Sequence, residues 1–450
     1  MERIKQEIET LIEQRNWNDI RQRIISWEVP EITDLLADVD KKDKVLIFRC
    51  LPRAVSAEVF SYMEPEDQDS LLRELTDSET RQILTNLDPD DRTAILEELP
   101  ATITLKLMNL LSYEDLKEAR FLLGYPEESV GRLMTPDYAE IKTEWTVERA
   151  LQHIRAVGKD NANINRLYIT DNEGKLLDDI RLRRLILADP DDKIRDIMDH
   201  SFISLSAFDD REKAVLTLQR YDIVAAPVVD SEGVLIGIVT VDDIMDVAEE
   251  EVTEDIQKSA AVAPLNMSYH RAGPFDLYTK RVGWLVALVF MNLISAGVIA
   301  AFEDSLAGAI TLVFFIPILL ASGGNSGSQS ATLIIRALVT NDVESSEWLG
   351  SLFKELMVGL LLGATLGIIV WFIGLLRGGI GLQGVKIGIV VSITMICIVI
   401  LANVVGVLLP FLLNKLKLDP AVASSPLITT IADATGLLIY FSVAEWILQI

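Results

Sequence analysis

Five uncharged or nearly uncharged stretches in the C-terminal part set the strongest limit on how this chain can fold. They cover residues 282–302, 305–335, 356–376, 387–414 and 420–444. At about 1.5 Å of rise per residue, a helix over any of them is long enough to cross a hydrocarbon core of about 30 Å. The sequence therefore predicts an α-helical membrane bundle of five spans, in residues 276–450.

Asp433 is the one charged side chain within the fifth stretch. A charge at bilayer depth is unfavourable by about 3 kcal/mol or more, so such residues usually face a bundle interior or a water-filled path. At helical spacing, Ser425, Thr429 and Asp433 fall on one face. Oxygen ligands in one stripe suit a hard cation such as Mg²⁺. The alternative is a packed or paired carboxylate, but the predicted spans contain no Lys or Arg to pair with it.

The second stretch contains Pro317 and then a run of small and polar residues at 322–330, which is unsuited to lipid exposure. Small residues allow helices to cross closely, while Asn325 and Gln329 need a partner or a cavity. A tight helix crossing and a pore lining are both compatible with this run.

Charge is segregated along the 450 residues. Residues 271–450 hold nine Lys/Arg and ten Asp/Glu of the 41 and 67 in the chain, which leaves residues 1–270 with a net charge of −25. Such acidity argues against nucleic acid and against docking on anionic lipid, since both need clustered Lys/Arg. It favours divalent cations as partners, with membrane lipid around the spans.

The N-terminal residues show no apolar signal-peptide region, so we expect the first 270 residues in the cytoplasm. Five spans then place the C-terminus outside a cell (inner) membrane. Two basic residues of the membrane part, Arg377 and Lys386, would lie outside, and seven inside, as the positive-inside rule requires. The seven are Arg271, Lys280, Arg281, Arg336, Lys354, Lys415 and Lys417.

The first 129 residues contain an internal repeat. Large apolar residues recur every twelve positions, at Leu51, Met63, Leu75, Leu87, Leu99 and Leu111. Pro, Asp or Ser punctuates most units and matches helix-start chemistry. We expect short stacked helices that form an all-α superhelical repeat domain, which is a binding or regulatory surface.

Residues 130–245 contain two parallel segments, each with an amphipathic helix, a strand, a Gly-containing turn and a second strand. Their order, and the tail Gly-Ile-Val-Thr-Val-Asp-Asp-Ile at 237–244, resembles an α/β tandem CBS pair. The resemblance implies that Thr240 and Asp243 contact the ribose of an adenine nucleotide such as ATP. In the first module, Arg181 and Arg184 stand where Thr and Asp would be expected.

An acidic segment follows, with six carboxylates between residues 246 and 255, and we assign residues 246–275 to a linking helix before the membrane. As a charge run, it could simply be a solvated face. Facing Asp88, Asp90 and Asp91 of the repeat domain, its carboxylates would instead repel one another unless Mg²⁺ bridged them. This pattern favours a contact that depends on cation concentration.

Taken together, the run at 323–330, the Asp-Pro-Ala at 419–421 and the segment from Pro426 to Gly436 resemble the MgtE family of magnesium channels and transporters. The resemblance implies a homodimer with the pore on its two-fold axis, Asp433 as the selecting carboxylate, and closure by cytosolic Mg²⁺. Ser425 departs from family members that carry an amide near this point. The candidate pore residues are Ser425, Thr429, Asp433 and Asn325. The candidate sensor residues are Asp90, Asp91, Asp243, Asp246, Glu251, Glu254 and Asp255.

Three other readings stay open at this point. A membrane enzyme would need a nucleophile with a base or a metal centre, and the spans contain only Asp433 as an ionisable candidate of that kind. A receptor for Mg²⁺ or a nucleotide would keep the soluble part and conduct nothing. A transporter of Co²⁺, Ni²⁺ or Zn²⁺ is disfavoured because the spans lack histidine and a thiolate cluster.

Overall fold

The computed structural model describes residues 11–12, 16–158, 163–265, 267, 269, 272–303, 310–340, 342–378 and 382–449. Arg271, one of the basic residues expected on the cytoplasmic side, lies outside the described residues, as do parts of the predicted linking segment. The chain divides into two compact units, residues 1–248 and 249–450. Each unit is considered by itself.

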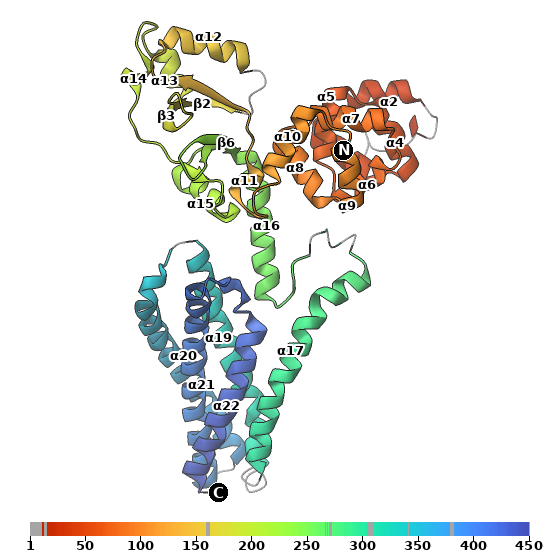
Figure 1. The fold of residues 1–450 in the computed structure, drawn as a ribbon. Helices are drawn as coiled ribbons and strands as arrows, with labels where there is room; N and C mark the ends of the chain where they lie inside the picture. Colours follow the sequence, from red (N-terminus) through yellow and green to blue (C-terminus); the bar gives the residue numbers. More distant parts are fainter. Residues whose placement is uncertain are drawn as a thin grey trace. The chain divides into compact units, whose positions relative to one another are not determined.

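The first unit begins with nine short helices whose first residues lie twelve positions apart, from Trp17 to Tyr113 (Figure 1). The predicted repeat and its all-α character are confirmed. The helices are α2 (Trp17–Ile24), α3 (Val29–Asp38), α4 (Lys41–Cys50), α5 (Arg53–Ser61), α6 (Pro65–Leu72), α7 (Asp77–Asn86), α8 (Pro89–Glu98), α9 (Ala101–Met108) and α10 (Tyr113–Leu122).

A second twelve-residue series, polar and buried, runs through these helices at their fourth position. Gln68 donates from Nε2 to the Phe60 carbonyl at 2.9 Å, and Arg92 donates from Nη1 to the Leu84 carbonyl at 3.2 Å. Each acceptor carbonyl lies eight residues before its donor, in the last turn of the preceding helix. That turn has carbonyls without intrahelical partners, so the repeat satisfies them from the next helix. The buried members are Lys44, Ser56, Gln68, Thr80 and Arg92.

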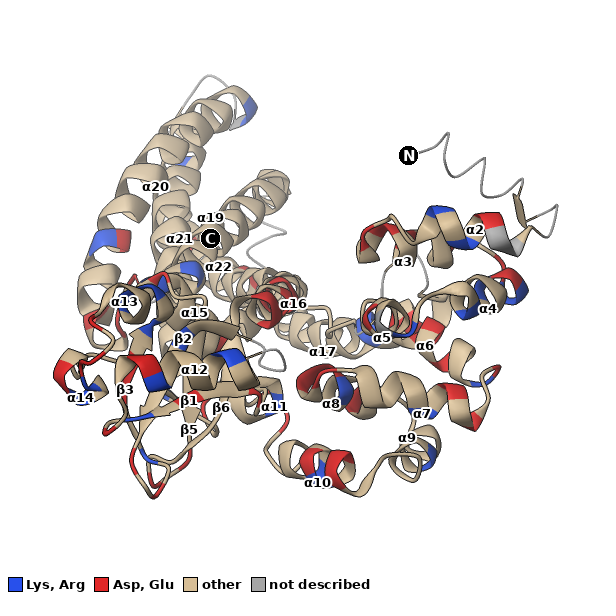
Figure 2. Ribbon diagram, turned by 90° about the horizontal axis from the view of Figure 1, so that it is seen from above, with Lys and Arg blue, Asp and Glu red and all other residues tan. Residues whose placement is uncertain are grey.

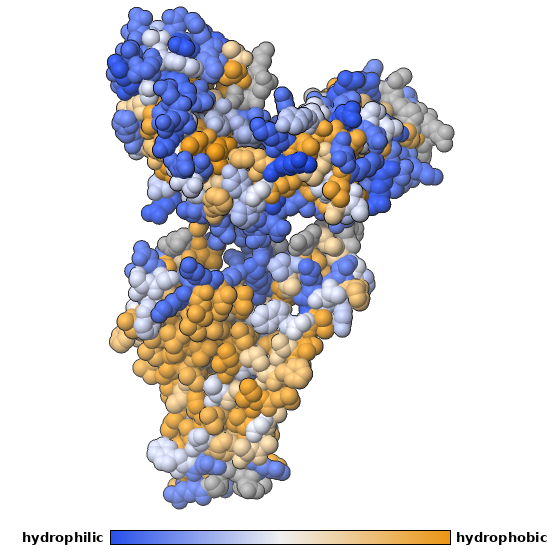
Figure 3. Space-filling view, in the orientation of Figure 1, coloured by the Kyte–Doolittle hydropathy of each residue, from blue (hydrophilic) through white to orange (hydrophobic). Residues whose placement is uncertain are grey.

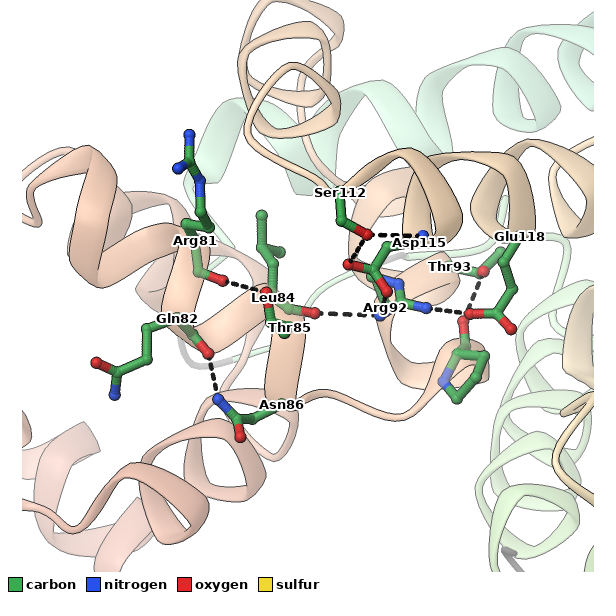
Figure 4. A network of polar contacts seen from close by, with 11 residues as sticks. Arg81, Gln82, Leu84, Thr85, Asn86, Arg92, Thr93, Ser112, Asp115 and Glu118 are labelled. Carbon is green, nitrogen blue, oxygen red and sulfur yellow. Dashed lines mark hydrogen bonds and ion pairs between the residues drawn. The ribbon is translucent and has the colours of Figure 1, made fainter. Parts of the chain in front are cut away.

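Within this series, Arg92 contacts two other helices (Figure 4). Besides the Leu84 carbonyl, its guanidinium pairs with Glu118 and lies 3.6 Å from Oδ1 of Asp115. Both carboxylates belong to α10, where Ser112 caps the helix by accepting from the Asp115 amide. Arg92 thus ties α8 to the end of α7 and to α10.

Two three-stranded sheets follow in the first unit, each with a parallel pair and an antiparallel pair. The elements are α11 (Val130–Leu133), β1 (Tyr138–Lys142), α12 (Val147–Val157), β2 (Asn163–Thr170), β3 (Leu176–Arg181), α13 (Leu182–Leu187), α14 (Ile194–Ile197), β4 (Leu205–Ser206), α15 (Arg211–Tyr221), β5 (Ala225–Val229) and β6 (Leu235–Thr240). The predicted α/β pair of modules is confirmed.

The turns of the two modules are built alike. Asp171 accepts from the amides of residues 173 and 175, and Asp230 accepts from those of residues 232 and 234. Gly174 and Gly233 adopt φ values of +84° and +81°, as expected for glycine in such turns. The two turns also bond to each other, since Leu176 and Leu235 donate to the carbonyls of Gly233 and Gly174.

Helix α16 (Val241–Ser259) starts directly after β6, five residues before the predicted linking segment. The second unit then holds α17 (Pro274–Ala301), the 3₁₀ turn η1 (Ile310–Phe315), α19 (Ile316–Val339), η2 (Ser345–Glu347), α20 (Trp348–Gly378), α21 (Leu382–Lys415), η3 (Pro420–Val422) and α22 (Ser425–Leu448). Among the described residues, five helical segments are long and apolar enough to span a membrane, as predicted. The surface of this bundle is predominantly apolar (Figure 3).

Helices α19 and α20 each pack with their backbone close to that of α21. A Cβ added at Gly406 of α21 would lie 2.4 Å from the Gly327 carbonyl oxygen of α19, and one at Gly374 of α20 would lie 2.7 Å from the Gly388 Cα of α21. Side chains larger than hydrogen would force these helices apart. The expected tight crossing at the small-residue run is present between α19 and α21.

Replacing Arg92 by Met tests the polar series. The Leu84 carbonyl and two α10 carboxylates would lose their donor, and an unsatisfied buried polar group is unfavourable by about 1–3 kcal/mol. We expect faster hydrogen exchange of the α8 and α10 amides in Arg92→Met. Arg73→Met, which removes an exposed i,i+4 pair with Asp69, is the matched control. Equal protection in the two variants would contradict this role.

Candidate ion path and candidate cation sensor

Helix α22 presents the predicted polar stripe. Its N-cap is Ser424, Pro426 stands in its first turn, and Ser425, Thr429 and Asp433 follow at four-residue spacing on one face. All three side chains are half-buried. Within the described part of the chain, no hydrogen bond or ion pair to the Asp433 carboxylate is formed. A carboxylate in a spanning helix is therefore held without a protein countercharge.

Helix α19 has two unlike faces. Gly323, Ser326, Gly327 and Ser330 are buried against neighbouring helices, whereas Asn325 and Gln329 are exposed on the surface of the unit. Thr332 and Arg336, also exposed, continue the polar face toward the helix end. Amides in a spanning segment need a polar partner or water. This face is therefore unsuited to contact with lipid tails.

Helices α19 and α22 are neighbours. A Cβ at Gly324 would lie 2.8 Å from Cγ2 of Thr429, so the two backbones approach closely at the middle of the stripe. Gly324 of α19 therefore packs against Thr429 in the stripe of α22, while Asn325, the next residue, is exposed. The two helices carry amide, hydroxyl and carboxylate oxygens, which are ligands for a hard cation.

In the first unit, carboxylates of α8 face carboxylates at the start of α16 (acidic residues are red in Figure 2). Asp90 is the most enclosed of them, and its Oδ1 is buried without a hydrogen-bond partner. Burial, and then the Asp243 and Asp91 carboxylates, raise the pKa of Asp90 well above its ordinary value. The ionised group is unfavourable there unless a proton or a cation compensates it.

The pKa values of Asp91 and Asp243 are also raised, by less than that of Asp90. Burial raises the pKa of Asp91 to about 6, against a hydrogen bond from Ser61, and the carboxylates of Asp242 and Asp246 add to it. Burial also raises the pKa of Asp243 to about 7, although Thr240 donates to it at 2.6 Å. Four of the predicted sensor residues, Asp90, Asp91, Asp243 and Asp246, therefore act on one another electrostatically.

These groups are not arranged as a finished metal site. Within the described residues, no three His, Cys, Asp or Glu side chains are grouped closely enough to hold an ion. The cluster is a gathering of repelling carboxylates, one of them unsatisfied, and not a coordination sphere. A hydrated cation, which is held through its waters, would suit such spacing better than a bare ion.

The remaining three predicted sensor residues, Glu251, Glu254 and Asp255, lie on the part of α16 that belongs to the second unit. There the central group is a lysine, which the sequence analysis did not single out. Lys258 pairs with Glu254 and donates from Nζ to Oδ2 of Asp419 at 2.7 Å. Burial opposes the charge, but the Asp419 and Glu254 carboxylates hold the pKa of Lys258 above its ordinary value.

Asp419 joins this cluster to the turn before α22. Its Oδ1 accepts from the Ala421 amide and so caps η3, the turn that leads into α22. Burial, followed by the Asp419 carboxylate, raises the pKa of Asp255. Lys258 and Asp419 lie 161 residues apart, so no sequence pattern could have paired them.

The predicted nucleotide contacts, Thr240 and Asp243, hydrogen-bond to each other, and Asp243 also belongs to the carboxylate cluster. In the first module, Arg181 and Arg184, together with Arg183 and Leu187, line a surface cavity of about 500 Å³. Arg184 pairs with Asp199 at 2.6 Å. The two modules therefore present opposite charges at corresponding points of the fold.

Models of known protein families match most of this chain. The model of the MgtE divalent cation transporter matches residues 316–443, that of the MgtE intracellular N domain matches residues 27–128, and CBS domains match residues 130–191 and 194–250. Magnesium transporter MgtE of Thermus thermophilus is 40% identical over 423 residues, which are 92% of this chain and 93% of that protein. Magnesium transporter MgtE of Bacillus subtilis is 31% identical over 94% of this chain and 88% of its own length.

Solved structures are similar to just over half of this chain. A cytosolic domain of the Mg²⁺ channel MgtE in complex with ATP is 30% identical, with a TM-score of 0.52, over 53% of this chain and 98% of that one. The soluble part of a magnesium transporter gives the same identity and TM-score over 56% of this chain and 99% of that one. The chain therefore belongs to the MgtE family of magnesium transporters.

Proposed function

We propose that this protein imports Mg²⁺ across the cell membrane along the polar faces of α19 and α22, with Asp433 as the selecting carboxylate. The observation that carries the proposal is the pair of adjacent polar faces within spanning helices, one exposed and one half-buried. Ser425, Thr429 and Asn325 supply further oxygens. A hard cation that keeps part of its water shell fits this ligand set.

The path is completed by a second copy of the chain. Asn325 and Gln329 are exposed on the single chain, and exposure to lipid would leave their amides without partners. A homodimer whose two-fold axis runs beside α19 and α22 turns these faces toward each other and encloses a water-filled path. The positive-inside pattern supports cytoplasmic N-terminal domains and an external C-terminus.

Cytosolic Mg²⁺ closes the path. At low Mg²⁺, the carboxylates of α8 and α16 repel one another, which favours separation of the repeat domain from the CBS pair. At high Mg²⁺, the cation compensates Asp90, Asp91, Asp243 and Asp246 and holds the domains together. Glu251, Glu254 and Asp255 act in the same way on the part of α16 near the membrane. Each cation site shifts the equilibrium between the open and closed states by the difference in its Mg²⁺ affinity between those two states.

ATP tunes this response. The related cytosolic domain solved in complex with ATP supports nucleotide binding by the CBS pair. Through Thr240 and Asp243, a nucleotide would engage a carboxylate that also belongs to the cation cluster. Binding of ATP and binding of Mg²⁺ are then coupled, and each changes the affinity for the other by the same factor.

The family description is that of a divalent cation transporter, so another divalent ion is the second candidate. Competition by Co²⁺, Ni²⁺ and Zn²⁺ against Mg²⁺ uptake decides between them. A receptor that conducts nothing would show no uptake at all.

The first test replaces Asp433 by Asn and measures Mg²⁺ uptake into proteoliposomes. We expect a loss of at least about tenfold, since a ligand contribution of about 1.4 kcal/mol or more changes occupancy by that factor. Asp342→Asn removes an exposed carboxylate outside the spanning segments of α19 and α22 and should leave uptake unchanged. Undiminished uptake in Asp433→Asn would remove this residue from the path.

The second test uses pH. Asp91 and Asp243 have folded-state pKa values above their ordinary ones, so the folded protein binds more protons between about pH 4 and pH 7. The contact is therefore most stable below this window and weakens as pH rises through about 6 to 7. Without Mg²⁺, we expect hydrogen-exchange protection of the first turns of α8 and α16 to fall between pH 5 and pH 8, after correction for intrinsic exchange.

Two additions sharpen the pH test. Added Mg²⁺ should restore protection at pH 8, and Asp243→Asn should flatten the pH profile, whereas Asp191→Asn in an exposed loop should not. Protection that is flat or rises with pH in the wild type would show that repulsion between these carboxylates does not control the contact.

The third test concerns Lys258. Lys258→Met leaves Asp419, Glu254 and Asp255 without their nearest cation, which favours release of α16. We expect the cytosolic Mg²⁺ concentration that halves uptake to rise at least about threefold, while Lys258→Arg stays close to wild type. Lys175→Met, in a turn of the CBS pair, is the control. An unchanged half-inhibitory concentration would exclude this ion pair from closure.

A further inference from the structure

A carboxylate near the start of α20 bonds to a buried amide of another helix, and α20 contributes no residue to the proposed path. Glu355 belongs to α20, seven residues after the first residue of that helix. Its Oε2 accepts from Nδ2 of Asn403 on α21 at 2.9 Å. Glu355 lies one residue before the apolar stretch 356–376, and Asn403 is buried within the bundle, so this pair connects the end of a span to the bundle interior.

Asn403 also forms hydrogen bonds with α19. Its side chain is 1% exposed, and its Oδ1 accepts from the Ser326 hydroxyl at 2.6 Å. Its backbone carbonyl accepts from the Ser330 hydroxyl at 3.4 Å. One chain of hydrogen bonds therefore joins α20, α21 and α19.

The orientation of the Asn403 amide depends on the carboxylate. An ionised carboxylate can only accept hydrogen bonds, so it selects the amide orientation in which Nδ2 points toward Glu355. Oδ1 then points toward Ser326, as observed. Without Glu355, the amide could turn its NH₂ group toward Ser326 and lose this preference.

Ser326 and Ser330 directly follow the two exposed amides of the candidate path, Asn325 and Gln329. Neighbouring residues on a helix differ by about 100° in direction, so fixing the buried serines fixes the rotation of α19 and the direction of the exposed amides. The close approach of Gly406 to the Gly327 carbonyl lies between the two serines in sequence and leaves little room for another setting.

We propose that Glu355 is a positioning residue for ion conduction, which acts through Asn403 and Ser326 to set the rotation of the pore helix α19. It touches no part of the path itself. The inference rests on the proposed function, in which Asn325 of α19 faces the ion. It adds a residue on a third helix that determines where that amide points.

The test compares Glu355→Ala, Glu355→Gln and wild type in Mg²⁺ uptake by the full chain in proteoliposomes. Glu355→Ala is expected to raise the half-saturating Mg²⁺ concentration at least about threefold, with the maximum rate per reconstituted protein within about twofold of wild type. Glu355→Gln can donate as well as accept, so it does not select the Asn403 amide orientation and should shift the half-saturating concentration in the same direction as Glu355→Ala. Thr365→Val is the matched control on α20, since Thr365 donates to the Leu361 carbonyl of its own helix.

Ser326→Ala gives an independent measurement from the other end of the chain of hydrogen bonds, and it leaves the carboxylate in place. It should produce a similar threefold shift, and the double variant Glu355→Ala/Ser326→Ala should shift no further than either single one, because the connection is already interrupted. This measurement decides the matter even where Glu355→Ala does not assemble.

Three results would overturn the inference: an unchanged half-saturating concentration in Ser326→Ala, additive shifts in the double variant, or a wild-type half-saturating concentration in Glu355→Gln. Failure of the proposed function looks different, because wild type would then carry no Mg²⁺ or Asn325→Ala would leave uptake unaltered. Wild-type uptake that depends on Asn325 but not on Ser326 rejects only the positioning role.

Discussion

Removal of water from carboxylate and amide groups is the constraint on which both halves of this protein depend. In the first unit, Asp90 has a buried oxygen without a hydrogen-bond partner next to other carboxylates. In the membrane unit, Asp433 is held in a spanning helix beside exposed amides of α19. Neither arrangement is favourable for the bare chain, and under the proposed function a hydrated cation would supply the missing compensation in both. The proposed path and its proposed control would then rest on the same ion chemistry.

The repeat domain shows how such an unfavourable cluster can be kept in place. Arg92, two residues after Asp90, bonds to the end of α7 and to carboxylates of α10. Gln68, two repeats earlier in the twelve-residue series, donates to the Phe60 carbonyl in the same manner. The contacts of Arg92 hold α8 against α7 and α10 beside Asp90, whose Oδ1 has no hydrogen-bond partner.

Periodicity and span length were enough to predict the helical repeat, the paired α/β modules and the five membrane helices, because each is set by local sequence. The polar face of α22 was likewise visible as Ser425, Thr429 and Asp433 at four-residue spacing. What the sequence could not supply was pairing between distant segments. The twelve-residue apolar pattern drew attention to leucines, although the polar series with Gln68 and Arg92 has the same period and could have been found.

Lys258 and Asn403 are harder cases. A lysine in an acidic run is typical of a solvated face, and only its partner Asp419, far along the chain, shows that it joins α16 to the turn before α22. Asn403 stands alone in a long apolar stretch, where its amide requires partners on other helices. A lone amide in a predicted span is therefore a usable signal, but it cannot name Glu355 or Ser326 as those partners.

Helix α16 makes these separate contacts interdependent. It carries Asp243 and Asp246 near one end and Lys258 near the other, and fifteen residues of helix separate Asp243 from Lys258 by about 22 Å. Under the proposed closure, compensation of the carboxylates at the start of α16 and the ion pair with Asp419 near its end would both act on this helix. Asp419 also caps the turn that leads into α22, the helix that carries the proposed path residues, so closure would reach the path through this turn.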